Sequence, residues 1–182
     1  GGHEKYHGAV VDHCGHENTR VFREIQTLGA RLKKLDEVVG TLTKSEIAIF
    51  HSTENQWALE DCQGYSNHGR KYVDTVLKFY APLWNRGINT DIISDKDDFG
   101  KYKAIIFPML YMVDSKLEDK ICEFVKNGGT AVATYMLGTV NENDLCHLGG
   151  LPCGRLKEVF GIWNEEIDTL YPDEANEVCF CE

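Results

Sequence analysis

The chain has 182 residues, of which 42% are hydrophobic and 10% aromatic, so it can bury a core of ordinary size. Its 19 basic residues are outnumbered by 29 acidic ones, which gives a formal charge of −10. This balance argues against a nucleic-acid partner, because phosphate recognition needs clustered lysine and arginine. No apolar run is long enough to cross a bilayer, so we expect no membrane partner.

Seven cysteines occur at irregular spacings, and the sequence contains no N-x-S/T glycosylation motif. An odd number of cysteines does not suggest a complete disulfide framework, so we predict a reducing, cytoplasmic location. The histidine and cysteine groups at 13–16, 146–153 and 179–181 lack four ligands at the spacing of a zinc finger. We therefore predict no metal and no cofactor.

The chain opens on the string His3-Glu4-Lys5-Tyr6-His7, which matches the H-E-x-x-H pattern of zinc peptidases. That site requires both histidines on one face of a stable helix. Glycines on both sides of the string oppose such a helix. A zinc metallopeptidase or metal-binding module built on His3, Glu4 and His7 stays an alternative only.

An extended segment over residues 9–11 is followed by an amphipathic helix for which Asn18 is the expected N-cap. Apolar residues at three- and four-residue spacing predict one buried stripe on this helix, formed by Val21, Phe22, Ile25, Leu28, Leu32 and Leu35. We expect no leading strand or targeting segment directly before these elements, and we therefore expect the chain to begin in the middle of a domain.

A polar linker over residues 36–44 leads into a second unit, in which compact apolar runs alternate with helical periods. This alternation is typical of a parallel α/β sheet. Strands are predicted over 47–50, 89–94, 104–107 and 130–135, with helices over about 69–86 and about 117–127. Seven apolar residues are expected on one face of the first of these helices: Tyr72, Val73, Val76, Leu77, Tyr80, Leu83 and Trp84.

Several short strings follow one another in an order that resembles one family closely. They are Gly-Gly-His-Glu-Lys-Tyr-His-Gly-Ala-Val-Val-Asp-His at 1–13, Asn-Thr-Arg-Val-Phe-Arg-Glu at 18–24, Glu-Asn-Gln-Trp-Ala-Leu-Glu at 54–60, Tyr-Lys at 102–103, Pro-Met-Leu-Tyr at 108–111, Asn-Gly-Gly at 127–129, Asn-Glu-Asn-Asp at 141–144 and Gly-Ile-Trp-Asn-Glu-Glu-Ile-Asp at 161–168. In this order they resemble glycoside hydrolase family 42 β-galactosidases.

The resemblance implies an α/β fold in two parts. Residues 1–40 would be the terminal strand, loop and helix of a (β/α)8 TIM barrel. Residues 41–182 would be the middle, trimerisation domain, truncated at its C-terminus. That domain is expected to form a flavodoxin-like doubly wound parallel sheet, similar to class I glutamine amidotransferases. An amidotransferase needs a nucleophilic cysteine on the turn after a strand. The turn at 108–111 has none, and Cys122 is expected in the core, so a stand-alone amidotransferase-like binding module stays a second alternative.

The implied activity is the retaining hydrolysis of terminal β-D-galactosides by two glutamates on barrel strands that precede this chain. We therefore expect no catalytic residue here and an isolated chain without activity. Glu4 and His7 match the residues with which the family hydrogen-bonds galactose hydroxyls, so they are the predicted substrate-binding residues. The implied partners are a galactoside, in the intact enzyme, and further copies in a homotrimer.

Two acidic groups could be paired carboxylates or a calcium site: Glu142 with Asp144, and Glu165 with Glu166 and Asp168. Neither shows the alternating oxygen ligands of a calcium loop. We predict that both are acidic surface turns with structural or interface roles.

Overall fold

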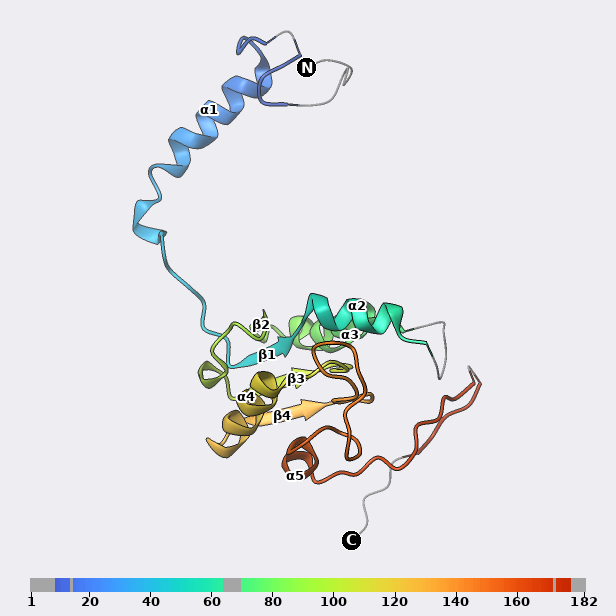
Figure 1. Ribbon diagram of the computed structural model, residues 1–182. Helices are drawn as coiled ribbons and strands as arrows, with labels where there is room; N and C mark the ends of the chain where they lie inside the picture. The colour runs from blue at the N-terminus through green and yellow to red at the C-terminus, as the bar shows by residue number, and fades with distance from the viewer. Residues whose placement is uncertain (1–8, 14, 64–69, 172, 178–182) are drawn as a thin grey trace. The chain divides into compact units, whose positions relative to one another are not determined.

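The computed structural model describes residues 9–13, 15–63, 70–171 and 173–177. The chain forms two units, Gly1–Thr43 and Lys44–Glu182, which are described separately (Figure 1). Among the described residues, no helix combines the length and the apolar character that a membrane span requires.

The first unit contains helix α1 (Arg20–Leu32) and the short 3-10 helix η1 (Asp36–Val38). The predicted helix is confirmed, but its N-cap is Thr19 rather than Asn18, because the Thr19 hydroxyl accepts a hydrogen bond from the Phe22 N–H at 3.1 Å. The stripe that was expected to be buried is largely exposed, since the described part of this unit has no second layer to cover it. Residues 9–11 form no strand there either, because no described strand of the unit lies beside them.

The second unit is built on a parallel sheet of four strands: β1 (Ile47–Phe50), β2 (Thr90–Ile93), β3 (Ala104–Phe107) and β4 (Thr130–Ala133). The strand order is β2-β1-β3-β4, so β1 and β3 are central. The prediction of a parallel α/β sheet is confirmed. Connections that leave the two central strands run to opposite sides of the sheet, which leaves a crevice between their carboxyl ends.

Helices cover both faces of this sheet (Figure 1). On one face lie α2 (Thr53–Asp61) and α3 (Tyr72–Asn85), and on the other lie α4 (Ser115–Lys126) and α5 (Leu156–Phe160). Each face has its own apolar core. Ile49, Leu59 and Val76 belong to the first core, and Phe107 and Ile121 belong to the second. Burial of these side chains is the main source of stability for such a layered domain.

The structure corrects two predictions about the helices. Helix α2 was not predicted, because its apolar residues Trp57, Ala58 and Leu59 are consecutive and show no helical period. The seven apolar residues of the next helix do not share one buried face: Tyr72 and Val76 are buried, whereas Val73, Leu77 and Trp84 are exposed. The exposed three lie on the neighbouring stripe of the helix, which points away from the sheet.

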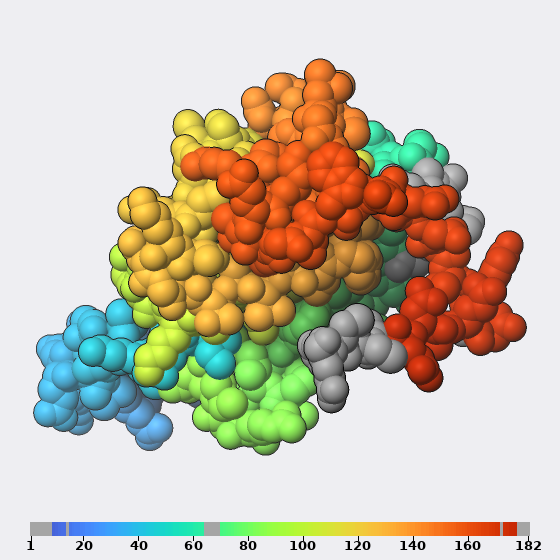
Figure 2. Space-filling view, turned by 90° about the horizontal axis from the view of Figure 1, so that it is seen from below, coloured from blue at the N-terminus to red at the C-terminus, as the bar shows by residue number. Residues whose placement is uncertain are grey.

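A long segment follows β4 and covers the α4 side of the unit, where it is coloured orange to red in Figure 2. Backbone hydrogen bonds fix its beginning to the turn after β3: the Gly138 N–H donates to the Leu110 carbonyl at 2.7 Å, and the Thr139 N–H donates to the Tyr111 carbonyl at 2.8 Å. The segment therefore lies beside the carboxyl ends of the central strands.

Candidate functional site

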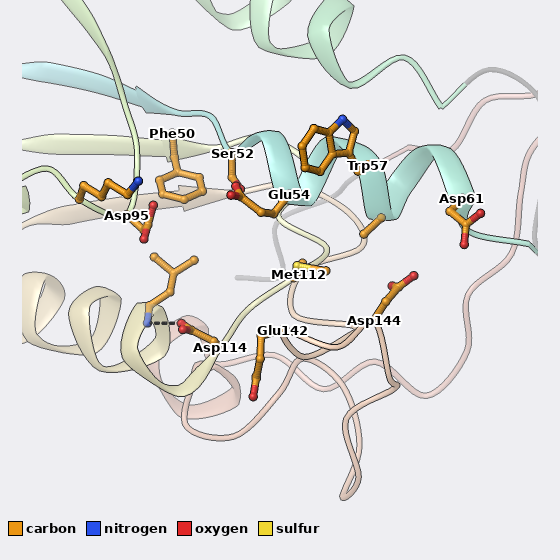
Figure 3. A pocket seen from close by; sticks show the side chains of 13 residues that line it. Phe50, Ser52, Glu54, Trp57, Asp61, Asp95, Met112, Asp114, Glu142 and Asp144 are labelled. Atoms are coloured by element: carbon orange, nitrogen blue, oxygen red, sulfur yellow. Dashed lines mark hydrogen bonds between the residues drawn. The ribbon is translucent and has the colours of Figure 1, made fainter.

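A cleft of about 550 Å³ opens at the carboxyl ends of β1 and β3 (Figure 3). This is the place at which an open α/β sheet ordinarily holds a ligand. The floor of the cleft is mainly apolar and its rim is acidic. The lining residues are Phe50, Ser52, Glu54, Trp57, Ala58, Asp61, Asp95, Lys96, Met112, Asp114, Leu117, Glu142 and Asp144.

One wall of the cleft is helix α2, which is held in place by the buried side chain of Asn55. The Asn55 Oδ1 accepts hydrogen bonds from the N–H groups of Tyr111 and Met112, both at 2.8 Å. Its Nδ2 donates to the Met109 carbonyl at 3.0 Å. A single amide thus satisfies three backbone groups after β3, and it fixes the helix against that segment.

The N-terminus of α2 is occupied by the protein's own polar groups. Ser52 Oγ accepts a hydrogen bond from the Asn55 N–H at 3.2 Å and donates one to Glu54 Oε2 at 3.1 Å. Hydrogen bonds from its own backbone N–H and from Ser52 lower the pKa of Glu54, so this carboxylate is charged at neutral pH. A negative charge here repels phosphate, which argues against a nucleotide or flavin site at this helix end.

The opposite wall is a loop shaped by Asn141. Its Oδ1 accepts hydrogen bonds from the N–H groups of Asn143 at 2.9 Å and Leu145 at 3.1 Å. These bonds form a compact turn from which Glu142 and Asp144 project, across Met112 from α2 (Figure 3).

Further contacts tie this loop to the segment after β3. The Val113 N–H donates to the Val140 carbonyl at 2.9 Å. The His147 Nε2 lies 2.9 Å from the Val113 carbonyl oxygen, which makes this histidine a structural contact. The loop is therefore held at both of its ends.

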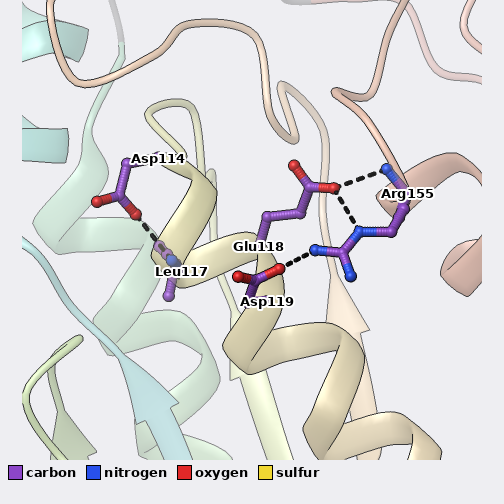
Figure 4. Close-up of polar contacts among 5 residues, drawn as sticks. All are labelled: Asp114, Leu117, Glu118, Asp119 and Arg155. Atoms are coloured by element: carbon purple, nitrogen blue, oxygen red, sulfur yellow. Dashed lines mark hydrogen bonds and ion pairs between the residues drawn. The ribbon is translucent and has the colours of Figure 1, made fainter.

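An ion-pair cluster anchors the end of the segment to α4 (Figure 4). Glu118 Oε1 accepts hydrogen bonds from the Arg155 backbone N–H at 2.8 Å and from its Nε at 3.1 Å, and the guanidinium also pairs with Asp119. Asp114 is the N-cap of α4, because its Oδ1 accepts a hydrogen bond from the Leu117 N–H at 2.7 Å. Both walls of the cleft are thus fixed by hydrogen bonds within the domain.

The turn after β3 has an unusual backbone but no nucleophile. Met109 has a φ of 42°, in the left-handed region that non-glycine residues seldom adopt, and its side chain is buried. Its N–H donates to Thr134 Oγ1 at 2.8 Å. Neither serine nor cysteine occurs in the turn from Pro108 to Tyr111. The arrangement therefore has no group for acyl transfer of the amidotransferase type.

Six carboxylates and one ammonium group line the cleft. Among the described residues, the carboxylates of Asp61, Asp95, Glu142 and Asp144 form no hydrogen bond or ion pair. The described part of the chain also contains no group of three or more side chains that could hold a metal ion. Chemically, the cleft suits the binding of a positively charged group that also has an apolar part.

The predicted sugar contacts Glu4 and His7, and His3 of the metal alternative, lie outside the described residues. The structure therefore gives no geometry for either site, and both stay predictions.

The two acidic groups singled out in the sequence lie in different places. Glu142 and Asp144 lie on the rim of the cleft, whereas residues 165–168 are not among those that line it. Trp57 and Met112 also line the cleft, and the sequence alone did not indicate them as site residues. The sequence did single out the strings at 54–60, 108–111 and 141–144, because they carry the family resemblance. All three lie at or beside the cleft.

The described cysteines are free thiols. Cys122 is partly buried and packs against the core, close to what was predicted, and burial raises its pKa. Cys153 is buried, and this burial, followed by the nearby charge of Glu118, raises its pKa to about 12. Both thiols are protonated at neutral pH and are poor nucleophiles.

Fold and cleft together define a parallel α/β domain suited to binding or assembly, without a nucleophile at the turn after its central strand. Residues 45–182 match the family model of the β-galactosidase trimerisation domain, and residues 1–35 match a second family model described as β-galactosidase. The chain belongs to the β-galactosidases of glycoside hydrolase family 42, and its larger unit is the trimerisation domain of that family.

Known relatives agree over almost the whole chain. The β-galactosidase Pbg of Clostridium perfringens is 52% identical over 178 residues, which is 98% of this chain and 26% of the relative. The β-galactosidase BglY of Alicyclobacillus acidocaldarius is 47% identical over 174 residues, which is 96% of this chain and 25% of the relative. The chain thus spans about a quarter of the length of these relatives.

Solved structures of β-galactosidases show the same fold. The enzyme from Bacillus circulans sp. alkalophilus matches with a TM-score of 0.77 at 47% identity, over 96% of this chain and 26% of that one. The enzyme from Rahnella sp. R3 matches with a TM-score of 0.74 at 46% identity, again over 96% of this chain and 26% of that one. The arrangement of parallel strands and helices described above is therefore that of its family.

Proposed function

We propose that the chain is part of a retaining β-galactosidase that hydrolyses terminal β-D-galactosides. The observation that carries this proposal is the succession of two family matches, β-galactosidase over 1–35 and trimerisation domain over 45–182. In this proposal residues 1–40 are the terminal strand, loop and helix of a (β/α)8 barrel. Residues 41–182 are a non-catalytic middle domain with a flavodoxin-like, doubly wound sheet.

The second part of the proposal concerns assembly and location. The middle domain would join copies of the enzyme into a homotrimer, for which the description of its family is the support. Free thiols at the described cysteines suit a reducing compartment, so we place the enzyme in the cytoplasm.

We assign part of the wall of the sugar pocket to Glu4 and His7. A carboxylate that accepts hydrogen bonds from sugar hydroxyls, beside an imidazole, is suitable chemistry for a polyol. In the full-length enzyme, Glu4→Gln and His7→Ala should each lower kcat/KM by roughly tenfold or more, because a contact to the sugar is lost. Glu165→Gln, which changes an exposed acid outside the cleft, is the matched control and should leave the kinetics unchanged. Wild-type kinetics for both Glu4→Gln and His7→Ala would remove this assignment.

The chain by itself should not hydrolyse galactosides, because both catalytic glutamates are expected on strands that precede it. A chromogenic galactoside assay of the purified chain tests this. Turnover that disappears in Glu4→Ala would contradict it. Metal analysis of the same preparation, purified without chelators, tests the metallopeptidase alternative, which requires stoichiometric zinc that is lost in His3→Ala.

A further inference from the structure

All three tryptophans of the second unit, Trp57, Trp84 and Trp163, are exposed, and the first two lie in different surroundings. Trp84 is 68% exposed on α3, where it stacks on Tyr80 with ring centroids 6.0 Å apart. Trp57 is 63% exposed on α2 and lines the cleft at the carboxyl ends of β1 and β3. Exposed tryptophans beside a cavity are typical of interfaces, because a large rigid side chain binds with little loss of entropy.

The cleft beside Trp57 is preformed. Asn55 fixes α2 through three hydrogen bonds to the backbone after β3, and Asn141 shapes the opposite loop through two more. Glu118 holds the end of the segment that carries that loop through the Arg155 backbone. A site with rigid walls loses little conformational freedom when it binds, which favours affinity.

The charges of the cleft indicate the kind of group that it accepts. The carboxylates of Asp61, Asp95, Glu142 and Asp144 form no hydrogen bond or ion pair among the described residues, and Lys96 is the one basic residue of the lining. Below this acidic rim lies an apolar floor that includes Met112 and Leu117. An arginine or lysine side chain combines an aliphatic stem for such a floor with a cation for such a rim. The face of an exposed tryptophan adds a cation–π contact, preferably to arginine.

We infer that the cleft formed by Trp57, Met112, Glu142 and Asp144 is an assembly contact, into which a second copy of the protein inserts a basic side chain. The inference rests on the proposed function, since it names the surface with which the trimerisation domain binds another copy. The carboxylates that line the cleft favour it over the exposed stripe of α3, because they can select a basic partner, whereas Val73, Leu77 and Trp84 carry no charge and could accept any apolar partner.

The test compares Trp57 with Trp84 in the full-length enzyme. The oligomeric state is measured by sedimentation velocity over a dilution series, and circular dichroism with thermal unfolding verifies that each variant is folded. Trp57→Ala should raise the concentration at which the oligomer dissociates by at least tenfold, and Trp57→Phe should restore part of the loss. Trp84→Ala is the matched control and should dissociate at the wild-type concentration. The inference would be overturned if the Trp84→Ala oligomer dissociated while the Trp57→Ala oligomer stayed associated at the wild-type concentration.

A second pair of variants tests the charge. Glu142→Lys combined with Asp144→Lys should dissociate the oligomer, whereas Glu123→Lys, at an exposed residue of α4 outside the cleft, should not. Glu142→Gln with Asp144→Asn should weaken the dependence of assembly on salt, because fewer charges then attract the partner. An unchanged oligomer and an unchanged salt dependence in all of these variants would contradict the inference alone. A wild-type enzyme that is monomeric at every concentration would contradict the proposed assembly as well.

Discussion

Asn55 shows how much one buried polar residue determines in this domain. Its side chain satisfies three backbone groups, one carbonyl and two N–H groups, inside the wall of the cleft. Asn55→Ala leaves all three without this partner, so we expect the free energy of unfolding to fall by about 2–4 kcal/mol in urea denaturation of the chain. Gln56→Ala, at a residue whose side chain contacts Glu60, should change it by no more than about 0.5 kcal/mol. Equal effects of the two changes would contradict the role given to Asn55.

The cysteines allow a second prediction for single residues. Burial raises the pKa of Cys153 to about 12, so almost none of it is thiolate at neutral pH, and the reactive thiolate appears only as the pH rises. Cys146 is exposed. Iodoacetamide followed by peptide mapping should modify Cys146 in the folded chain, and it should modify Cys153 only after unfolding. Modification of both residues at the same rate under native conditions would show that the segment after β4 opens readily.

Among the elements, the strands were easier to predict than the helices that surround them. Each strand is a short apolar run bounded by turn-forming residues, which is a local signal. Helix α2 lacks a local signal, because Trp57, Ala58 and Leu59 are consecutive and the helix is determined by its contacts with the rest of the domain. The face of α3 was predicted in part, since the spacing of Val73 and Leu77 is as helical as that of Tyr72 and Val76. Which stripe is buried depends on the sheet.

A carboxylate on β2 connects the beginnings of three strands and gives a pH-dependent prediction. Asp91 accepts hydrogen bonds from Ser45 Oγ, before β1, at 2.7 Å and from the Tyr102 hydroxyl, before β3, at 2.9 Å. Partial burial, followed by the hydrogen bond and charge of Asp91, raises the pKa of Tyr102 from 10.0 to about 12.

Below pH 10 the Tyr102 phenol is neutral in both the folded and the unfolded chain, so its contribution to stability is fully present there. Between pH 10 and about 12 the unfolded chain loses this proton first, so the free energy of unfolding falls as the pH rises. Tyr102→Phe should remove this part of the decline, which urea denaturation from about pH 9 to about pH 11 can measure. Parallel curves for the wild type and the variant would contradict the assignment.

For the whole molecule, the division into two units predicts how the chain is cut. Residues 33–44 are exposed throughout, and the division falls between Thr43 and Lys44. Brief trypsin treatment should cleave first after Lys33, Lys34 or Lys44, and further cleavage after Lys44 should leave a resistant fragment that begins at Ser45, because the sheet and its helices protect the remaining backbone. Mass spectrometry identifies the product. A first cleavage inside the sheet would argue against an independently stable second unit.

For the molecule as a whole, the sequence indicated several residues of the cleft but not that they lie close together in the fold. Glu142 and Asp144 were recognised as an acidic turn, and the string that contains Trp57 was recognised as typical of a family. The cleft arises only when α2, the segment after β3 and the loop at 141–144 are brought together by hydrogen bonds between residues far apart in the chain. Such long-range contacts have no signature in local spacing.

Met109 has a consequence for enzyme design. Its backbone already adopts the left-handed conformation at the end of a central strand, which costs on the order of 1–3 kcal/mol and is sustained by the surrounding contacts. A designer who wanted to add a reactive thiol or hydroxyl at this turn could therefore keep the main chain as it is. The remaining work would be to clear space above the turn and to supply a neighbouring base.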